Sequence, residues 1–283
     1  VVTFVRSVFR PALAGLLGYL LSAGLAQAEV PALQALVDAG TLPAMADRLP
    51  ENPRVITPIE SIGTYGGDLN LALRRGDGTH LLRLVGYEGL FSWDLDWKEM
   101  LPNLAEAYEV NADATEYTIH LRKGVKWVDY QANEKAEVVA EDFLWGLEWV
   151  LNEKKNLAAN MSMPSEMIVG AQEYFDYTKE LPEADALALG LEKFQEMVGI
   201  KAVDDYTLVF TCKAPMPYFA TLGSYNCRYP VSGKLLAELG AEGMKAVSYD
   251  TLWYNGPYTM TTYVQNNEKV LTKNPTYWNK DIQ

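Results

Sequence analysis

One stretch near the end of the chain restricts the fold most, because its residues specify an antiparallel hairpin. The stretch begins with Trp253-Tyr254-Asn255-Gly256-Pro257 and continues in two runs rich in Val, Thr and Tyr, Met260–Val264 and Lys269–Lys273. Asn266-Asn267 stands between the runs, where a tight turn needs left-handed backbone that Asn tolerates. The pattern therefore predicts a β-hairpin that is entered through Gly256-Pro257.

Strand and helix patterns alternate along much of the remaining chain. Tyr117, Ile119 and Leu121 alternate with polar residues, which is typical of a half-buried strand, and Ala140–Leu151 carries the apolar stripe of a helix. Gly199–Phe210 predicts a strand, a turn and a second strand. Three further helices are expected at Val30–Ala39, Ala184–Val198 and Gly233–Leu239. This mixture predicts an α/β or mixed α+β fold.

The first 28 residues have the composition of a secretory signal peptide. Arg6 and Arg10 give a basic start, and Ala12–Ala26 is uncharged and rich in Leu and Ala. Ala26-Gln27-Ala28 then matches the small-x-small rule for cleavage. A membrane anchor is the alternative, but the apolar run is shorter than the roughly 20 residues that span a bilayer. We therefore expect export, cleavage after Ala28 and a periplasmic protein.

Charge and cysteine content restrict the partners. Lys and Arg number 24 against 37 Asp and Glu, which gives a net charge of −13. That balance repels nucleic acid and anionic lipid, so neither is an expected partner. The two cysteines, Cys212 and Cys227, are spaced to form a disulfide if the compartment is oxidising, and the alternative is two small buried side chains.

Motifs of common enzyme classes are missing from the sequence. It contains no GxSxG, HExxH or P-loop, and with 2 His and no CxxC pair neither a metal nor a redox cofactor is expected. Better candidates for ligand contact are Trp253, Tyr254 and Asn255 beside Gly256, because glycine lets backbone approach a ligand and an amide can bond a peptide group. The alternative is a strand entry that packs on the sheet.

Several segments, in consistent order, resemble the extracellular solute-binding proteins of family 5, which serve oligopeptide, dipeptide and nickel ABC importers. The similar segments are Tyr87–Phe91, Pro102–Glu106, Tyr117–Trp127, Ala140–Phe143, Val203–Leu208, Pro217–Phe219, Asn255–Tyr258 and Lys273–Trp278. Two departures stand out. Val128-Asp129-Tyr130 replaces a glycine-containing turn, and Val139 stands where Thr usually caps a helix, a loss of about 1 kcal/mol unless a nearby acid substitutes.

The resemblance implies a type II periplasmic-binding-protein fold in which this chain carries the first lobe and the second lobe is missing. Residues 29–59 are then expected to form an extended N-terminal segment. Residues 60–87 and 199–283 are expected to build the base sheet of the lobe, and residues 88–198 an appended subdomain.

The resemblance also implies a function without catalysis. It implies that the protein captures a peptide in the periplasm as a monomer and delivers it to the ABC permease of the inner membrane. An oligosaccharide or a nickel complex remains an alternative ligand, and an exported hydrolase with a carboxylate-based site an alternative function. The resemblance implies ligand contact by two loops, whose residues are Gly76, Asp77, Gly78, His80, Tyr87 and Glu88. With the aromatic segment, which consists of Trp253, Tyr254, Asn255 and Gly256, these are the candidate ligand-binding residues.

Overall fold

The computed structural model describes residues 31–49, 85–94, 96–156, 162–225, 228–265 and 267–279. The chain divides after Asp47 into two compact units. The first contains α2 (Pro31–Asp38), and α3 (Met45–Arg48) lies at the division. The expected helix before Gly40 is confirmed, since Gly40 has a φ of 70° just beyond its end. The short helix α3 interrupts the segment that the prolines predicted to be extended.

A four-stranded antiparallel sheet organises the second unit. Its strand order is β3-β4-β8-β7, and β4 pairs with β8 although most of the helices lie between them in sequence. These strands are β3 (Ala105–Val110), β4 (Glu116–Leu121), β7 (Ile200–Asp204) and β8 (Thr207–Thr211). The predicted strand at Tyr117–Leu121 and the strand pair within residues 199–210 are therefore confirmed.

Three two-stranded hairpins accompany this sheet. They are β1 (Phe91–Trp93) with β2 (Met100–Pro102), β5 (Lys126–Val128) with β6 (Glu134–Glu137), and β9 (Tyr258–Val264) with β10 (Glu268–Lys273). The last pair is the hairpin that the sequence predicted, although Asn266 of its turn lies outside the described residues.

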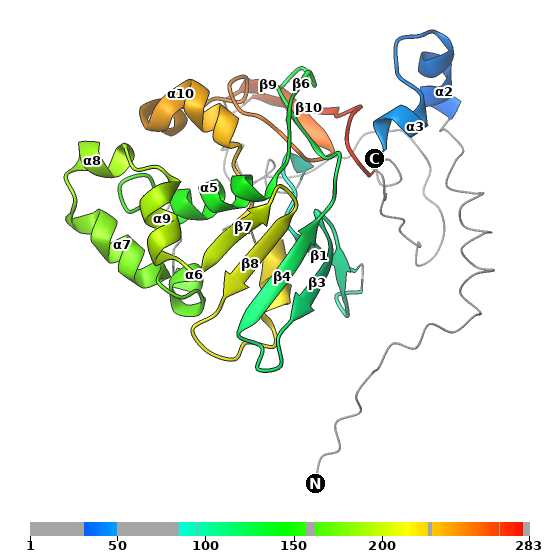
Figure 1. Cartoon of the computed structure of the whole chain (residues 1–283). Helices are drawn as coiled ribbons and strands as arrows, with labels where there is room; N and C mark the ends of the chain where they lie inside the picture. The colour runs from blue at the N-terminus through cyan, green and yellow to red at the C-terminus, as the bar shows by residue number, and fades with distance from the viewer. Residues whose placement is uncertain are drawn as a thin grey trace, which may run out of the picture. The chain divides into compact units, whose positions relative to one another are not determined.

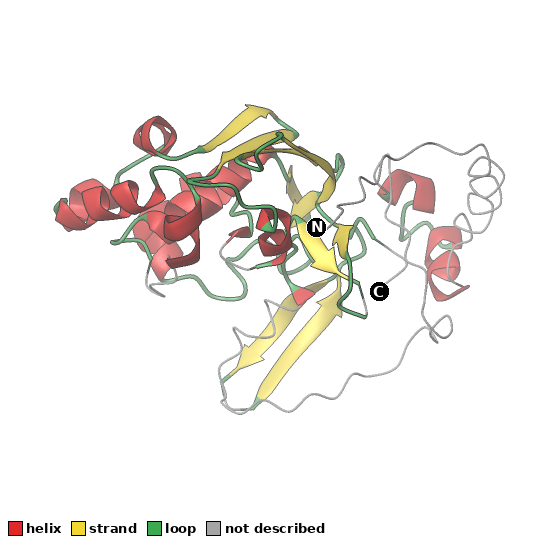
Figure 2. Cartoon of the chain, turned by 90° about the horizontal axis from the view of Figure 1, so that it is seen from below, coloured by secondary structure: helices red, strands yellow, loops and turns green. Residues whose placement is uncertain are grey.

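Helices gather beside the β7 edge of the sheet (Figures 1 and 2). They are α5 (Ala140–Leu151), α6 (Ser162–Met167), α7 (Ala171–Glu180), α8 (Glu183–Leu187), α9 (Leu191–Met197) and α10 (Gly233–Lys245), and a 3-10 turn, η1 (Phe219–Ser224), packs near β1. Among the described residues, no helix has the length and apolar character that crossing a bilayer requires.

The core forms where the apolar face of the sheet meets α5. Tyr117 and Ile119 of β4 are buried, as are Phe143, Leu144 and Leu147 of the helix. Burying a side chain of this size contributes roughly 1.5–3 kcal/mol each, so this contact supplies much of the apolar burial of the unit. The periodicities of 2 and 3.6 that predicted these elements are the same periodicities that fill the core.

Asp142 binds the start of α5, where Val139 is the N-cap and has no side-chain acceptor. Its Oδ2 accepts a hydrogen bond from the backbone N of Val139 at 3.1 Å, and its Oδ1 accepts one from the backbone N of Gly233 at 3.0 Å. A single carboxylate therefore binds the first turn of α5 and the first turn of α10, where unpaired N–H groups favour negative charge. Asp142 thus makes one half of a capping box, whereas the hydrogen bond that a Thr side chain at position 139 would accept stays absent.

Candidate functional site

The segment Trp253–Pro257 is the sequence-predicted site that the structure describes most fully, and it enters β9. We call it the entry segment. Backbone N–H groups of Asn255 and Gly256 both donate to the carbonyl of Gly86, at 3.3 and 3.0 Å. Gly256 has no room for a side chain, because an added Cβ would lie 2.6 Å from the carbonyl O of Val85. The entry segment is therefore locked against the backbone of residues 85–88.

Asn255 and Glu88 join these two segments through side chains. The Oδ1 of Asn255 accepts a hydrogen bond from the backbone N of Glu88 at 3.0 Å. The carboxylate of Glu88 accepts in turn from the hydroxyl of Tyr277 at 2.5 Å and from the Nδ2 of Asn103. Both carboxylate oxygens of Glu88 thus accept hydrogen bonds within the protein, which favours a structural role for Glu88 in holding these segments together.

Asn255 retains one unused donor. Its side chain is 1% exposed, and its Nδ2 has no hydrogen-bond partner in the described part of the protein. A buried amide N–H without a partner costs roughly 1–3 kcal/mol, so such a group calls for a specific explanation. This donor is the one buried side-chain group of the entry segment in the described residues whose hydrogen-bonding capacity is not met.

Tyr254 is tied into the protein on both its backbone and its ring. Its backbone pairs with Val128 through N–H···O bonds of 2.8 and 2.9 Å, its hydroxyl donates to the carbonyl of Tyr249 at 2.6 Å, and its ring stacks on Tyr87 with centroids 5.9 Å apart. Burial raises the pKa of both tyrosine hydroxyls, and the neighbouring Tyr87 raises that of Tyr254 further. Both phenols therefore remain neutral at physiological pH.

Trp253 is buried, with 6% of its surface exposed, and belongs to the main core. The structure thus brings together six of the ten sequence-predicted residues, namely Tyr87, Glu88, Trp253, Tyr254, Asn255 and Gly256. The other four, Gly76, Asp77, Gly78 and His80, lie outside the described residues. Ligand contact by any of the ten stays a prediction.

Sequence reasoning missed the supporting residues Asn103, Asn274 and Tyr277. The Nδ2 of Asn274 donates to the carbonyl of Gly256 at 3.0 Å, and its backbone N donates to the carbonyl of Pro257 at 2.8 Å. Asn103 and Asn274 are both buried. In the sequence each stands next to a proline, and an Asn beside a Pro in a predicted turn is the signal that would have identified them.

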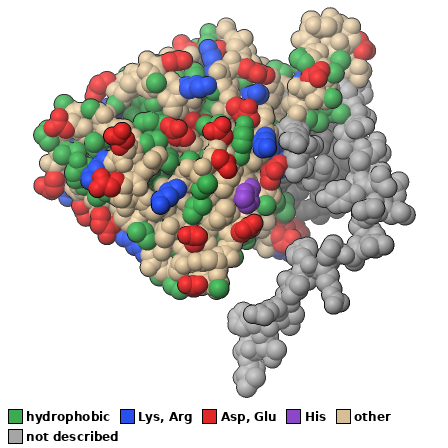
Figure 3. Space-filling view, viewed as in Figure 1, with side chains coloured by type: hydrophobic (Ala, Val, Ile, Leu, Met, Phe, Trp, Pro, Cys, Tyr) green, Lys and Arg blue, Asp and Glu red, His purple; other side chains and the backbone are tan. Residues whose placement is uncertain are grey.

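Outside the entry segment, the groups that could carry chemistry include a cysteine and dispersed carboxylates. Cys212 is a buried thiol, and burial raises its pKa, while Cys227 lies outside the described residues, so their disulfide stays a prediction. Within the described ranges, no three His, Cys, Asp or Glu side chains converge as a metal site would require. Carboxylates spread over the visible face among fewer basic groups (Figure 3).

Comparison with protein families places most of the chain in one family. Residues 99–283 match the family described as bacterial extracellular solute-binding proteins, family 5 Middle. The oligopeptide-binding protein AmiA of Streptococcus pneumoniae is 29% identical over 213 residues, covering 75% of this chain and 30% of AmiA. The periplasmic oligopeptide-binding protein OppA of Escherichia coli is 32% identical over 193 residues, covering 68% of this chain and 31% of OppA.

A solved structure gives the same result for the fold. The structure of Listeria monocytogenes OppA bound to peptide is 28% identical in sequence and superposes with a TM-score of 0.57 over 72% of this chain and 36% of that one. The chain therefore spans about a third of the length of the proteins that it matches, and the type II periplasmic-binding fold applies to that portion.

Proposed function

Since the chain belongs to the bacterial extracellular solute-binding proteins of family 5, we propose that it forms part of a protein that captures peptides and delivers them to an ABC permease. The observation that carries this proposal is the match over residues 99–283, together with 29–32% identity to proteins named for oligopeptide binding. A peptide is preferred over an oligosaccharide or a nickel complex because these relatives are peptide-binding proteins.

The proposed activity is binding without catalysis. The relatives reported above are binding proteins, and the hydrogen bonds of Glu88 to Asn103 and Tyr277 favour a structural role for this carboxylate. Capture would follow the closure of two lobes about a hinge, with the ligand stabilising the closed form by its higher affinity for it. Extended peptides commonly bind through main-chain hydrogen bonds, for which a buried amide such as Asn255 is a suitable donor.

Export to the periplasm, cleavage after Ala28 and a monomeric state belong to the same proposal. Export and cleavage rest on the basic and apolar composition of residues 1–28, which lie outside the described residues, and on the extracellular character of the family. Determining the N-terminal residue of the protein recovered from a periplasmic extract tests the cleavage site directly. A start at Glu29 is expected, whereas retention of Arg6 would contradict it.

A ligand screen tests the proposed binding activity. The melting temperature of the whole protein of which this chain forms part is measured with pools of tri- to hexapeptides, with oligosaccharides and with a nickel–histidine complex. Turnover of chromogenic peptides and glycosides is followed in parallel. We expect an increase in melting temperature with peptides alone and no turnover, because a ligand that binds only the native state stabilises it by mass action. Turnover of either chromogenic substrate would instead favour the exported hydrolase.

Asn255 provides the residue-level test. Asn255→Asp keeps the oxygen that accepts from the Glu88 backbone but removes the unused N–H donor. If that donor binds the peptide, affinity falls about tenfold. Because the new carboxylate is buried without a countercharge, the melting temperature of the free protein falls as well, and affinity is measured at a temperature where the variant is fully folded. Unchanged peptide affinity would assign Asn255 to the structural brace only.

A further inference from the structure

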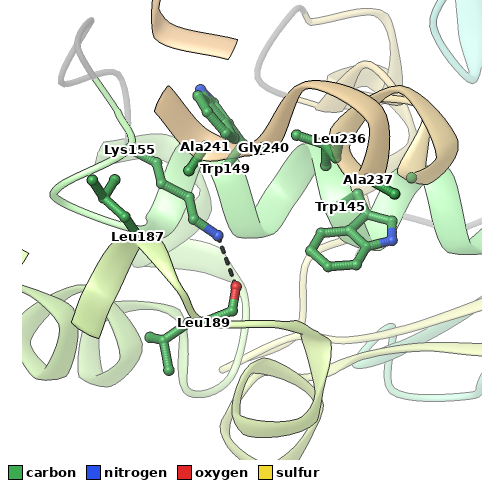
Figure 4. Close-up of a pocket in the computed structure, with 10 residues that line it drawn as sticks. Trp145, Trp149, Lys155, Leu187, Leu189, Leu236, Ala237, Gly240 and Ala241 are labelled. Atoms are coloured by element: carbon green, nitrogen blue, oxygen red, sulfur yellow. Dashed lines mark hydrogen bonds between the residues drawn. The ribbon is translucent and has the colours of Figure 1, made fainter. Parts of the chain in front are cut away.

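A cavity of about 220 Å³ lies between α5, α10 and the turn that joins α8 to α9, outside the entry segment. Its lining includes Trp145, Trp149 and Lys155 on one side and small residues of α10 on the other (Figure 4). An apolar cavity of about 150 Å³ is already large enough to take benzene. The cavity is therefore large enough for a small molecule that consists of one ring and a substituent.

The backbone of α10 creates this space. At its start, Gly233 packs so closely on Trp145 that an added Cβ would lie 2.6 Å from the indole Nε1. Gly240 interrupts the same helix with φ 66° and ψ 172°, and an added Cβ there would meet nothing within 4 Å. The helix is thus pressed against α5 at its first turn and bent farther along, which leaves the cavity open between them.

The walls favour a planar apolar group. Trp145 and Trp149 are spaced four residues apart on α5, so both indoles lie on one face of the helix. The α10 side contributes Gly233, Leu236, Ala237, Gly240 and Ala241. All of these except Leu236 are small and leave room beside the indoles. Aromatic rings stack favourably on indole, with a gain of about 0.5–1.5 kcal/mol beyond the area buried.

The wall also contains the ammonium group of Lys155, whose charge Glu148 balances. The ammonium of Lys155 donates to Glu148 Oε2 and to the carbonyl of Leu189, each at 2.9 Å, and it lies 5.9 Å from the centroid of the Trp149 ring. An ammonium has three N–H donors, so one remains after these two bonds. Because Glu148 balances its charge, the remaining donor favours a neutral acceptor such as a carbonyl over an anion.

We propose that this cavity is a second ligand site, which binds a small neutral molecule with a planar apolar ring and one hydrogen-bond acceptor. The ring lies against Trp145 and Trp149, and the acceptor takes the third N–H of Lys155. Since every lining residue belongs to this chain, the site does not depend on the proposed binding of peptides.

Titration calorimetry of the full chain with benzamide tests the site. We expect saturable binding at one site per chain, and weaker binding of benzoate, which is charged, and of cyclohexanecarboxamide, which is not planar. Ala237→Leu fills the cavity with a side chain that a helix accepts and weakens benzamide binding at least about tenfold. Ala246→Leu, the same change at the end of the helix and outside the cavity, leaves it unchanged.

Each result decides for or against the site. Ala241→Leu, from the next turn of α10, provides a second blocking variant if Ala237→Leu lowers the melting temperature. Absence of saturable benzamide binding, or equal affinity in the wild type and both blocking variants, overturns the proposal. Tighter binding of benzoate than of benzamide overturns the assigned preference for a neutral ligand.

Discussion

Gly256 shows how a single residue positions the candidate site. An added Cβ would lie 2.6 Å from the C of Gly86, 2.6 Å from the O of Val85 and 2.7 Å from the N of Tyr87, all of them backbone atoms. Flexible side chains move aside readily. These backbone atoms do not, because they belong to residues 85–88, to which the entry segment is hydrogen-bonded. The glycine is therefore required by close approach of two backbone segments.

We expect Gly256→Ala to lower the free energy of unfolding by about 1–3 kcal/mol, because the methyl group forces the two backbone segments apart. Urea denaturation measures this change. Gly190→Ala is the matched control, since an added Cβ there meets nothing within 4 Å and its φ is −92°. Equal stabilities of the two variants would show that residues 85–88 move away from Gly256 without cost.

Asp129 organises the turn between β5 and β6, where the family pattern has a glycine. Its Oδ1 accepts from the backbone N of Gln131 and of Asn133, each at 3.0 Å, and Lys135 lies 3.3 Å from its Oδ2. Ala132 takes the left-handed conformation with a φ of 64°. The side-chain hydrogen bonds of Asp129 and the left-handed Ala132 thus hold the turn, and its difference from the glycine-containing turn of the family stays a prediction.

Asp129 also makes the turn sensitive to acid. Burial raises the pKa of its carboxyl, but hydrogen bonds from Asn133, Lys135 and Gln131 outweigh burial, and the pKa lies below the usual 3.8. A depressed pKa contributes stability that is present above the unfolded value and is lost as pH falls through the folded value. We expect Asp129→Asn to cost about 1 kcal/mol at pH 7 and less near pH 3. Urea denaturation of both proteins at the two pH values would contradict this if the difference stayed constant.

The sequence predicted only some of the residues and contacts of the candidate site. The residues of the entry segment are identifiable because Gly, Pro and Asn mark a strand entry. Their partners are not, since Glu88 and Asn255 are separated by 167 residues and the hydrogen bond between them depends on the whole fold. The same reason hides the contact of Tyr277 with Glu88.

At the scale of elements, periodicity predicted helices and strands where one face is clearly apolar. The range Ala140–Leu151 was correct at both ends, whereas the single helix expected at Ala184–Val198 is two helices, α8 and α9, with Gly190 capping the second. The helix expected to end at Gly240 continues to Lys245 beyond a kink. Gly190 thus separates two helices, whereas Gly240 only bends one, and the sequence does not distinguish these two effects of glycine.

The helix α7 was missed because, apart from Ala171, its buried residues carry hydroxyl groups. Tyr174 and Thr178, one helical turn apart, are each fully buried, yet neither gives an apolar stripe. Tyr174 donates to Glu148 Oε1 at 2.9 Å, and Glu148 also accepts from Asn152 at 2.9 Å. Hydrogen bonds, in place of apolar contacts alone, attach α7 to α5, and a hydropathy pattern does not report them.

This buried network makes Lys155 a critical residue for the helical part. The side chains of Lys155 and Glu148 are 4% and 0% exposed and 2.9 Å apart. We expect Lys155→Met to lower the free energy of unfolding by about 3–5 kcal/mol, because it leaves the Glu148 carboxylate buried without its countercharge. The double variant Glu148→Gln with Lys155→Met removes that charge and should recover part of the loss. Thermal denaturation in which the double variant is less stable than the single one would contradict this explanation.

At the scale of the whole molecule, the sequence indicated the class of fold but not the order of strands. Pairing of β4 with β8 joins residues 116–121 to 207–211 across five helices, a contact that neither alternation nor turn residues specify. The motif series indicated the family, and residues 99–283 match its model. Motif order thus carries topological information that local patterns lack.

The net charge of −13 gives a prediction about ligand capture that depends on the proposed function. Opposite charge accelerates diffusional encounter, and salt screens the effect with a Debye length of about 10 Å at 0.1 M. We expect a lysine-containing peptide to associate faster than its glutamate-containing counterpart in 10 mM salt, with the difference shrinking by about tenfold or more in 0.5 M salt. Stopped-flow measurement of the association rate constants checks this. If the two peptides associate at equal rates in low salt, the acidic groups in Figure 3 lie too far from the binding surface to steer a ligand.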